Sequence, residues 1–209
     1  MSAPSNPSRF LQLRWFLPLL AASCAQTGGS IDPDDDRADR SNSHCPSYAD
    51  PIQTGRVTDS EASEISGVVM SRMNPGVFWI HNDGDGSTVR LYAVDREGRI
   101  LQEIAVDDFE LSDLEDIAIG PGPIEGQDYL YLADTGDNAN DRKEVQIIRL
   151  PEPNLDVGPI ADPTLRSKVD VLRFRYDDKD PHDAEALMVD PDSGEIYIIT
   201  KHGPDERHT

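Results

Sequence analysis

Two short segments set the pattern that the rest of this chain follows: Asp113-Leu-Glu-Asp-Ile-Ala-Ile119 and, after a loop rich in Gly and Pro, Tyr129-Leu-Tyr-Leu-Ala-Asp134. Both are short, contain β-branched, aromatic or other apolar residues and are bounded by turn-forming residues, so we expect two antiparallel strands. Acidic residues stand at the ends of these strands. The same arrangement occurs once before and once after, which predicts a repeat protein.

Each repeat begins with a pair of such strands, and the first two repeats continue with two more. We expect strands of the first unit at 64–70, 77–83, 88–94 and 99–106. Those of the second unit are expected at 113–119, 129–134, 144–150 and 169–176. The third unit supplies two strands, at 183–189 and 195–200. Short strands joined in sequence by tight turns predict antiparallel meanders.

Four-stranded units that recur every several tens of residues are typical of a β-propeller. The sequence therefore predicts an all-β fold, with two full propeller blades and half of a third. A β-sandwich of similar strands is the alternative. Because propellers close with about four to eight blades, we expect either a fragment of a longer propeller or a chain that assembles with other copies.

The charge of the chain is strongly acidic. There are 40 Asp and Glu residues against 19 Lys and Arg residues, which gives a formal net charge of −21. Such a chain repels nucleic-acid phosphates, so no nucleic-acid partner is expected. Acidity suits cation binding, although a solvated acidic surface is the simpler explanation for most of these charges.

The N-terminus has the pattern of an export signal. Arg9 and Arg14 precede a short apolar run at 15–22, and small residues then precede Cys24. The segment Ala21-Ala22-Ser23-Cys24 resembles the end of a bacterial lipoprotein signal, so residues 1–24 are a predicted lipoprotein-type signal peptide. Acylated Cys24 would anchor the chain to the membrane as a cell-envelope lipoprotein. Cleavage by the general signal peptidase is the alternative, and it would give a secreted or periplasmic protein.

Residues 25–57 are rich in Gly, Ser, Pro and Asp, and lack an apolar period. They are too polar to offset the entropy of ordering, so a disordered acidic tether is predicted. Residues 58–209 then form the predicted partial propeller. Only two cysteines, Cys24 and Cys45, are present, which excludes a disulfide-stapled scaffold and a four-cysteine zinc site.

Carboxylates recur at equivalent positions of the predicted first strands. Ser66, Glu115 and Glu185 share one repeat position, and the position two residues earlier holds Glu64, Asp113 and Asp183. First strands line the channel of a propeller, so these side chains are expected to converge at one mouth. Crowded carboxylates repel one another unless they protonate or bind a cation, and oxygen ligands suit Ca²⁺ or, less often, Mg²⁺. Plain solvation in the channel is the alternative.

Other candidates follow the second strands. Asp134 ends one of them and is a further candidate metal ligand, while Asn82, Asp83, Asp137 and Asn138 add oxygen donors. Asp and Asn are also the residues that tight turns require, so turn formation is the alternative. His81 ends the equivalent strand of the first unit and is a candidate general base beside a metal. A hydrogen-bonded histidine without catalytic function is the competing interpretation.

The residues Leu114-Glu-Asp-Ile-Ala-Ile119, followed by Leu130-Tyr-Leu-Ala-Asp134, resemble the first-blade motif of the paraoxonase-like calcium-dependent phosphotriesterases. More broadly, the repeat resembles phytase-like and lipoprotein β-propellers of secreted bacterial proteins. The resemblance implies that Glu115 and Asp116 are Ca²⁺ ligands. Neighbouring strand residues point to opposite faces, so both can bind one ion only near a bulge or a strand end.

Three functions are compatible with these patterns. The first is an exported, lipid-anchored propeller that binds a ligand or a protein as a scaffold, with Ca²⁺ at the channel mouth. The second is a Ca²⁺-dependent hydrolase of esters, lactones or phosphate esters. The third is an inactive fragment of a longer propeller. The sequence contains no Gly-x-Ser-x-Gly elbow, and whether the protein is an enzyme stays open at this point.

Overall fold

The structure of the protein is a computed structural model that describes residues 49–155 and 169–201. The predicted signal peptide, Cys24 and most of the predicted tether lie outside these residues. The described residues from 54 onward belong to one compact unit, and this unit contains all the strands. Within the described part, no helix is long and apolar enough to span a membrane.

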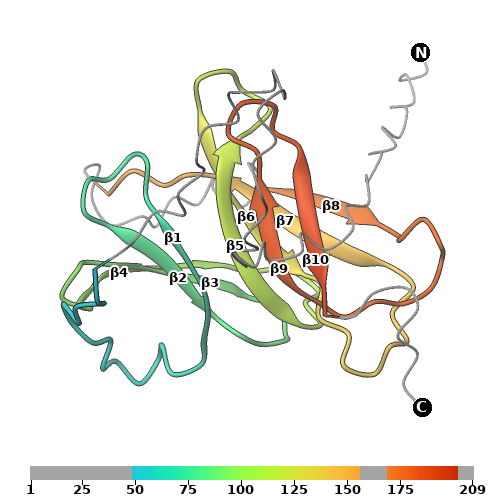
Figure 1. Cartoon of the computed structure of the whole chain (residues 1–209), viewed down its shortest axis with the longest axis horizontal. Coiled ribbons are helices and arrows are strands. Elements are labelled where there is room, and N and C mark those ends of the chain that lie inside the picture. The colour runs from blue at the N-terminus through green and yellow to red at the C-terminus, as the bar shows by residue number, and fades with distance from the viewer. Residues whose placement is uncertain (1–48, 156–168, 202–209) are drawn as a thin grey trace, which may run out of the picture. The chain divides into compact units, whose positions relative to one another are not determined.

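The first sheet is an antiparallel meander of four strands in sequence order (Figure 1). Its strands are β1 (Ile65–Met70), β2 (Phe78–Asn82), β3 (Val89–Val94) and β4 (Ile100–Val106). The second sheet repeats this order. Its strands are β5 (Leu114–Pro121), β6 (Asp128–Asp134), β7 (Val145–Pro151) and β8 (Asp170–Phe174).

The third sheet has two antiparallel strands, β9 (Ala184–Val189) and β10 (Ile196–Thr200). Each of the strands predicted from the sequence is therefore present, and the all-β class and the four-stranded antiparallel sheets are confirmed. β1 lies against β5, and β5 lies against β9. The described strands show no closed ring.

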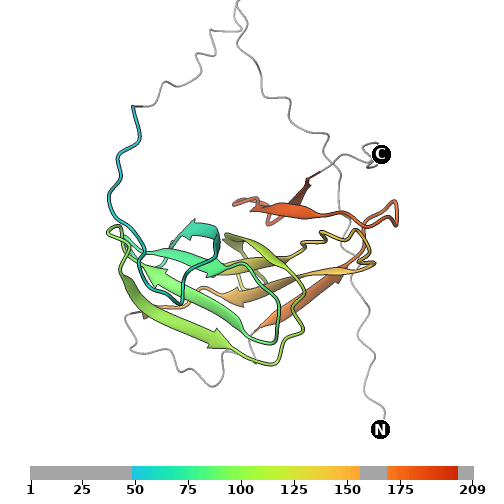
Figure 2. The ribbon, with the colours of Figure 1, turned by 90° about the horizontal axis from the view of Figure 1, so that it is seen from below.

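The core lies between successive sheets. On β6, Leu130 and Leu132 face the first sheet, where they pack in one cluster with Trp79 and Leu91. Tyr129 and Tyr131 point to the opposite face of β6 and belong to a second cluster. Leu187 of β9 packs into that second cluster, so the third sheet covers the second sheet (Figure 2). The alternation along β6 thus buries both of its faces, as expected for an inner sheet.

The first hairpin of each sheet has a β-bulge at the same position of the repeat. The residues that the pairing skips are Ser66 in β1, Glu115 in β5 and Glu185 in β9. A bulge changes the direction of the local side chains and bends the strand. The three bulges lie at the N-terminal ends of adjacent strands β1, β5 and β9. This end of the strands holds the recurring acidic residues.

Candidate metal centre

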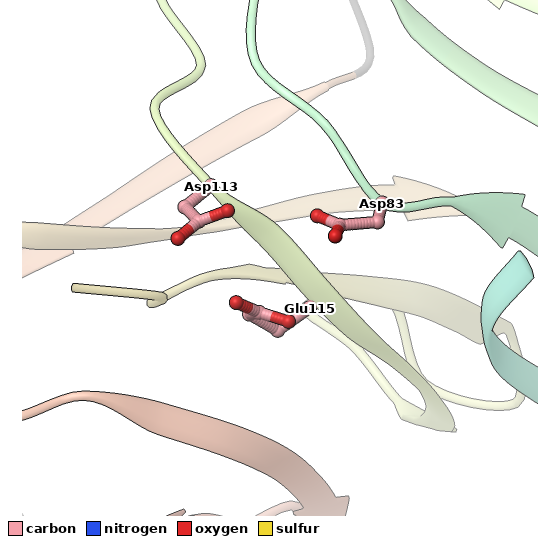
Figure 3. Close-up of side chains that lie close together, drawn as sticks. All are labelled: Asp83, Asp113 and Glu115. Atoms are coloured by element: carbon pink, nitrogen blue, oxygen red, sulfur yellow. The ribbon is translucent and has the colours of Figure 1, made fainter. Parts of the chain in front are cut away.

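Five carboxylates gather at the bulged ends of the strands and form two groups that share one member. Asp83, Asp113 and Glu115 make up the first group, and Figure 3 shows their carboxylates turned toward one another. Glu115, Asp183 and Glu185 make up the second. Within each group, one oxygen of every carboxylate lies within 4.8 Å of the others. We refer to the five residues together as the acidic cluster.

The first group draws its members from two sheets. Asp83 directly follows β2, Asp113 directly precedes β5, and Glu115 is the bulged residue of β5. Asp113 and Glu115 stand two residues apart, so they share a strand face. The loop that follows β6 closes the group, because Gly136 donates its backbone N–H to the Asp113 carbonyl at 3.2 Å.

Glu115 is the most enclosed member of the acidic cluster. Only 6% of its surface is exposed. Among the residues that the structure describes, none donates a hydrogen bond to its carboxylate or forms an ion pair with it, although its backbone carbonyl accepts a hydrogen bond from Ser66 Oγ at 2.6 Å. A buried carboxylate without a partner is costly when ionised. The site therefore favours a proton or a cation at Glu115.

Electrostatics at Glu115 follow from this enclosure. Burial is the largest cause that raises the pKa of the Glu115 carboxyl to about 7. Negative charges nearby raise it further, chiefly those of Glu185, Asp113 and Asp83, whereas the positive charge of Lys201 lowers it. Burial also raises the pKa of Asp113, and the charge of Asp83 adds to that rise. A cation would relieve the repulsion that adds to the effect of burial at both carboxyls.

The backbone of the 135–138 loop approaches the acidic cluster closely at Gly136. A Cβ atom there would lie 2.3 Å from Glu115 Oε1 and 2.4 Å from Asp113 Oδ2. Asn138 donates its Nδ2 to Asp113 Oδ2 at 3.2 Å. Glycine thus leaves the space in which the two carboxylates meet, and an amide side chain supplies a further polar group beside them.

The second group already contacts a positive charge. Lys201 directly follows β10, and its Nζ lies 2.8 Å from Asp183 Oδ2 and also contacts Glu185 Oε1. These hydrogen bonds, first that to Asp183 and then that to Glu185, raise the pKa of Lys201. Lys201 is therefore charged at neutral pH and neutralises part of this group.

Of the predicted metal ligands, the structure brings Glu115 and Glu185 together, in the second group. Asp116 and Asp134 belong to neither group. Asp116 accepts backbone N–H groups instead, from Ile117 at 2.8 Å and from Leu187 at 2.7 Å. Strand alternation is the reason, because it points Asp116 away from the face of Glu115 and toward the third sheet. Despite the bulge, Glu115 and Asp116 do not converge.

Asp134 is fully buried and its oxygens have partners. Oδ1 accepts the N–H of Asp113 at 2.8 Å, and Oδ2 accepts Gln146 Nε2 at 2.6 Å. Arg142 Nη2 lies 3.1 Å from Oδ1. These contacts fix the start of β5 beside the acidic cluster, so Asp134 positions Asp113 in the structure.

His81, the candidate general base, is also fully buried. Its Nδ1 lies 2.8 Å from the Asn82 carbonyl oxygen, and its Nε2 has no hydrogen-bond partner within the described part of the chain. The imidazole occupies the space above Gly67, where a Cβ would lie 2.6 Å from Nε2. Burial lowers the pKa of His81. The ring is an interior group beside Gly67 of β1, and it belongs to neither acidic group.

The sequence named Asp83 only as an oxygen donor with turn formation as the alternative, and it gave Lys201 no function. Both residues directly follow the second strand of their sheet. Each donates its backbone N–H to the carbonyl of the residue that lies two positions before the bulged residue. Asp83 donates to Glu64 at 2.7 Å, and Lys201 donates to Asp183 at 2.8 Å. Aligning the repeats through this position would have placed both residues beside the carboxylates.

Comparisons with protein-family models, with curated proteins and with solved structures found no match for this chain.

Proposed function

We propose that this chain belongs to an exported, lipid-anchored β-propeller that binds a ligand or a protein partner as a scaffold, and that a Ca²⁺ ion at the acidic cluster orders the binding end. The observation that carries the proposal is Glu115. It is 6% exposed, it faces other carboxylates, and its own carboxylate has no partner among the described residues. Such a group is stabilised by a proton or by a counter-ion, and a cation would neutralise the neighbouring carboxylates as well.

The propeller assignment is supported by the recurrence of one unit. The first two sheets have the same four-stranded order, and a bulge occurs at one repeat position in all three sheets. Successive sheets pack face to face through apolar clusters. Innermost strands of propeller blades line the central channel, and on this assignment the acidic cluster lies at one of its mouths. The proposed similarity of this chain to calcium-dependent bacterial propellers depends on the same assignment.

Calcium is favoured over other cations by the ligand chemistry. The cluster offers carboxylate oxygens, and it contains neither a thiol nor an imidazole. Hard oxygen donors suit Ca²⁺ and Mg²⁺, and Ca²⁺ accepts irregular geometry with six to eight oxygens more readily than Mg²⁺ does. The first group brings three carboxylates from a loop and a bulged strand, which is an irregular arrangement. Water and backbone carbonyls complete such coordination spheres.

A hydrolase is the weaker candidate, because its proposed base, His81, is enclosed between strands and belongs to neither group of carboxylates.

The membrane anchor rests on the sequence around Cys24. Incorporation of labelled fatty acid into the wild-type chain but not into Cys24→Ser supports the anchor, and equal labelling of both contradicts it.

The metal proposal is tested by calorimetric titration of the purified chain with CaCl₂ and with MgCl₂, together with thermal unfolding in excess Ca²⁺ and in EDTA. We expect Ca²⁺ to bind and to raise the unfolding temperature, since a ligand that binds only the folded state stabilises it. Asp113→Asn is expected to weaken binding by about tenfold or more. Glu125→Gln is the matched control, because it removes one negative charge from an exposed residue in the β5–β6 turn. Identical melting curves in Ca²⁺ and in EDTA would overturn the metal proposal.

A further inference from the structure

The acidic cluster is asymmetric. Its second group holds the Lys201 ammonium between Asp183 and Glu185. Its first group has no such cation among the residues that the structure describes: Asp113 accepts one side-chain hydrogen bond, from Asn138, and Arg142 is engaged with Asp134 and with the Gly136 carbonyl. Glu115 belongs to both groups and has no partner in either.

We propose that Lys201 is a tethered cation that occupies the Asp183–Glu185 side of the acidic cluster, so that the cluster binds a single divalent ion, held by Asp83, Asp113 and Glu115. This rests on the proposed function, since it assigns the ligands and the stoichiometry of the same site. It goes beyond that proposal by giving one half of the cluster to a side chain of the protein and the other half to an exogenous ion.

The position of Lys201 is built into the repeat. Its backbone N–H donates to the Asp183 carbonyl at 2.8 Å, and this bond closes the β9–β10 hairpin beside the bulge at Glu185. The side chain therefore starts from a fixed point within reach of both carboxylates. At the equivalent position of the first sheet the residue is Asp83. The same repeat position therefore holds a proposed metal ligand, Asp83, in the first sheet, and a positively charged side chain that replaces a metal ion, Lys201, in the third.

Charge explains why the two halves are not equally available. A divalent ion on the second group would have to displace the ammonium from Asp183 and Glu185 or lie beside it, and two positive charges in contact repel. The first group carries no ammonium to displace. Glu115 is the carboxylate that both halves share, and it is 6% exposed and turned into the cluster. With Lys201 held by Asp183 and Glu185, a divalent ion that neutralises Glu115 is best placed on the side of Asp83 and Asp113.

The test is calorimetric titration of the purified wild-type chain, Lys201→Met and Lys201→Arg with CaCl₂. We expect one ion per chain for the wild type and for Lys201→Arg, which keeps the charge. Lys201→Met is expected to bind a second ion, or to bind the first at least about tenfold more tightly. One ion with an unchanged affinity in Lys201→Met would overturn the assignment of Lys201, and so would two ions in the wild type.

A second pair of variants keeps the inference testable if Lys201→Met does not fold. Asp113→Asn removes a proposed ligand of the ion, whereas Glu185→Gln removes a carboxylate that Lys201 occupies. We expect the first to weaken Ca²⁺ binding by about tenfold and the second by less than about threefold. Equal losses would overturn the division of the cluster. If neither the wild type nor Lys201→Met binds Ca²⁺, the proposed function itself fails, and a wild type that binds one ion separates the two failures.

Discussion

Glu115 is held among other carboxylates in the interior, and this has a consequence for the protein without a bound ion. The pKa of Glu115 is about 7 in the folded state against an ordinary value of 4.5. Between these two pH values the folded protein binds more protons at this position than the unfolded chain does. The free energy of unfolding therefore decreases as the pH rises through this window.

Glu115→Gln removes this titration and keeps the shape of the side chain. In EDTA, we expect the variant to be more stable than the wild type at pH 8, by about 2 kcal/mol once solvent screening at the open side of the cluster is allowed for. The difference should vanish well below pH 4.5, where the wild-type carboxyl is protonated in both states. Urea unfolding of both proteins across this range measures it.

Saturating Ca²⁺ should make the wild type more stable than Glu115→Gln at pH 8, because the wild type then binds the ion and the variant lacks a ligand. Glu125→Gln is the control for loss of one negative charge, since Glu125 is exposed in the β5–β6 turn. A wild type whose stability in EDTA does not fall between pH 5 and pH 8 relative to Glu115→Gln would show that the carboxyl is not perturbed.

The repeat in the sequence was enough to predict that Glu115 and Glu185 lie together. It was not enough to decide which of the neighbours Glu115 and Asp116 faces the other carboxylates. A strand pattern shows that the two side chains point to opposite faces, but it does not show which groups each face contacts. Asp116 meets the backbone N–H of Leu187, which comes from another sheet. Asp83 could not be separated from a turn residue, because Asp is common in tight turns. Lys201 was missed because a lysine after a strand is an ordinary surface residue.

At the scale of strands and sheets, the sequence predicted the strand positions because apolar alternation and turn residues are local signals. The bulges are not local in that sense. Each arises from a mismatch between two paired strands, and no residue type marks it: the bulged residues are Ser66, Glu115 and Glu185. The bulges determine where the acidic side chains point, so the site could be predicted only in outline.

Glu152, which directly follows β7, joins the first two sheets. Its carboxylate is buried and accepts hydrogen bonds from Trp79 Nε1 at 3.0 Å, Ser71 Oγ at 2.5 Å and the Met73 N–H at 3.0 Å. Every one of these partners is a donor, and they come from β2 and the β1–β2 turn. Glu152 therefore attaches the first sheet to the end of β7.

Glu152→Gln replaces one acceptor oxygen by an NH₂ group that faces donors, so a buried hydrogen bond is lost and a repulsive contact is introduced. We expect it to lower the free energy of unfolding by about 2–4 kcal/mol, measured by urea denaturation.

Glu144→Gln is the matched control at the other end of β7. Glu144 is half-exposed and its ion pairs with Arg173 and Arg175 are long, at 4.0 and 3.6 Å. Its substitution should change stability by less than about 0.5 kcal/mol. Equal effects of the two variants would mean that the Glu152 contacts do not hold the sheets together.

For the whole molecule, the net charge of −21 is the dominant electrostatic fact. Like charges destabilise the compact state through self-repulsion, and salt screens that repulsion. This effect is diffuse and needs no particular residue. It has to be separated from specific binding of an ion at the acidic cluster, since both raise stability when CaCl₂ is added.

We expect the unfolding temperature in EDTA to rise by a few degrees between about 0.02 and about 0.5 M NaCl, because the Debye length shrinks below the spacing of surface charges. KCl should have the same effect at equal ionic strength, since screening depends on charge and not on ion identity.

CaCl₂ at matched ionic strength should add a further increase in the wild type, and little of it should remain in Asp113→Asn, where a proposed ligand is missing. Differential scanning fluorimetry of the two proteins in the three salts separates the effects. An unfolding temperature that falls with NaCl would show that attractive ion pairs outweigh self-repulsion, and an equal calcium increment in both proteins would place the bound ion outside the acidic cluster.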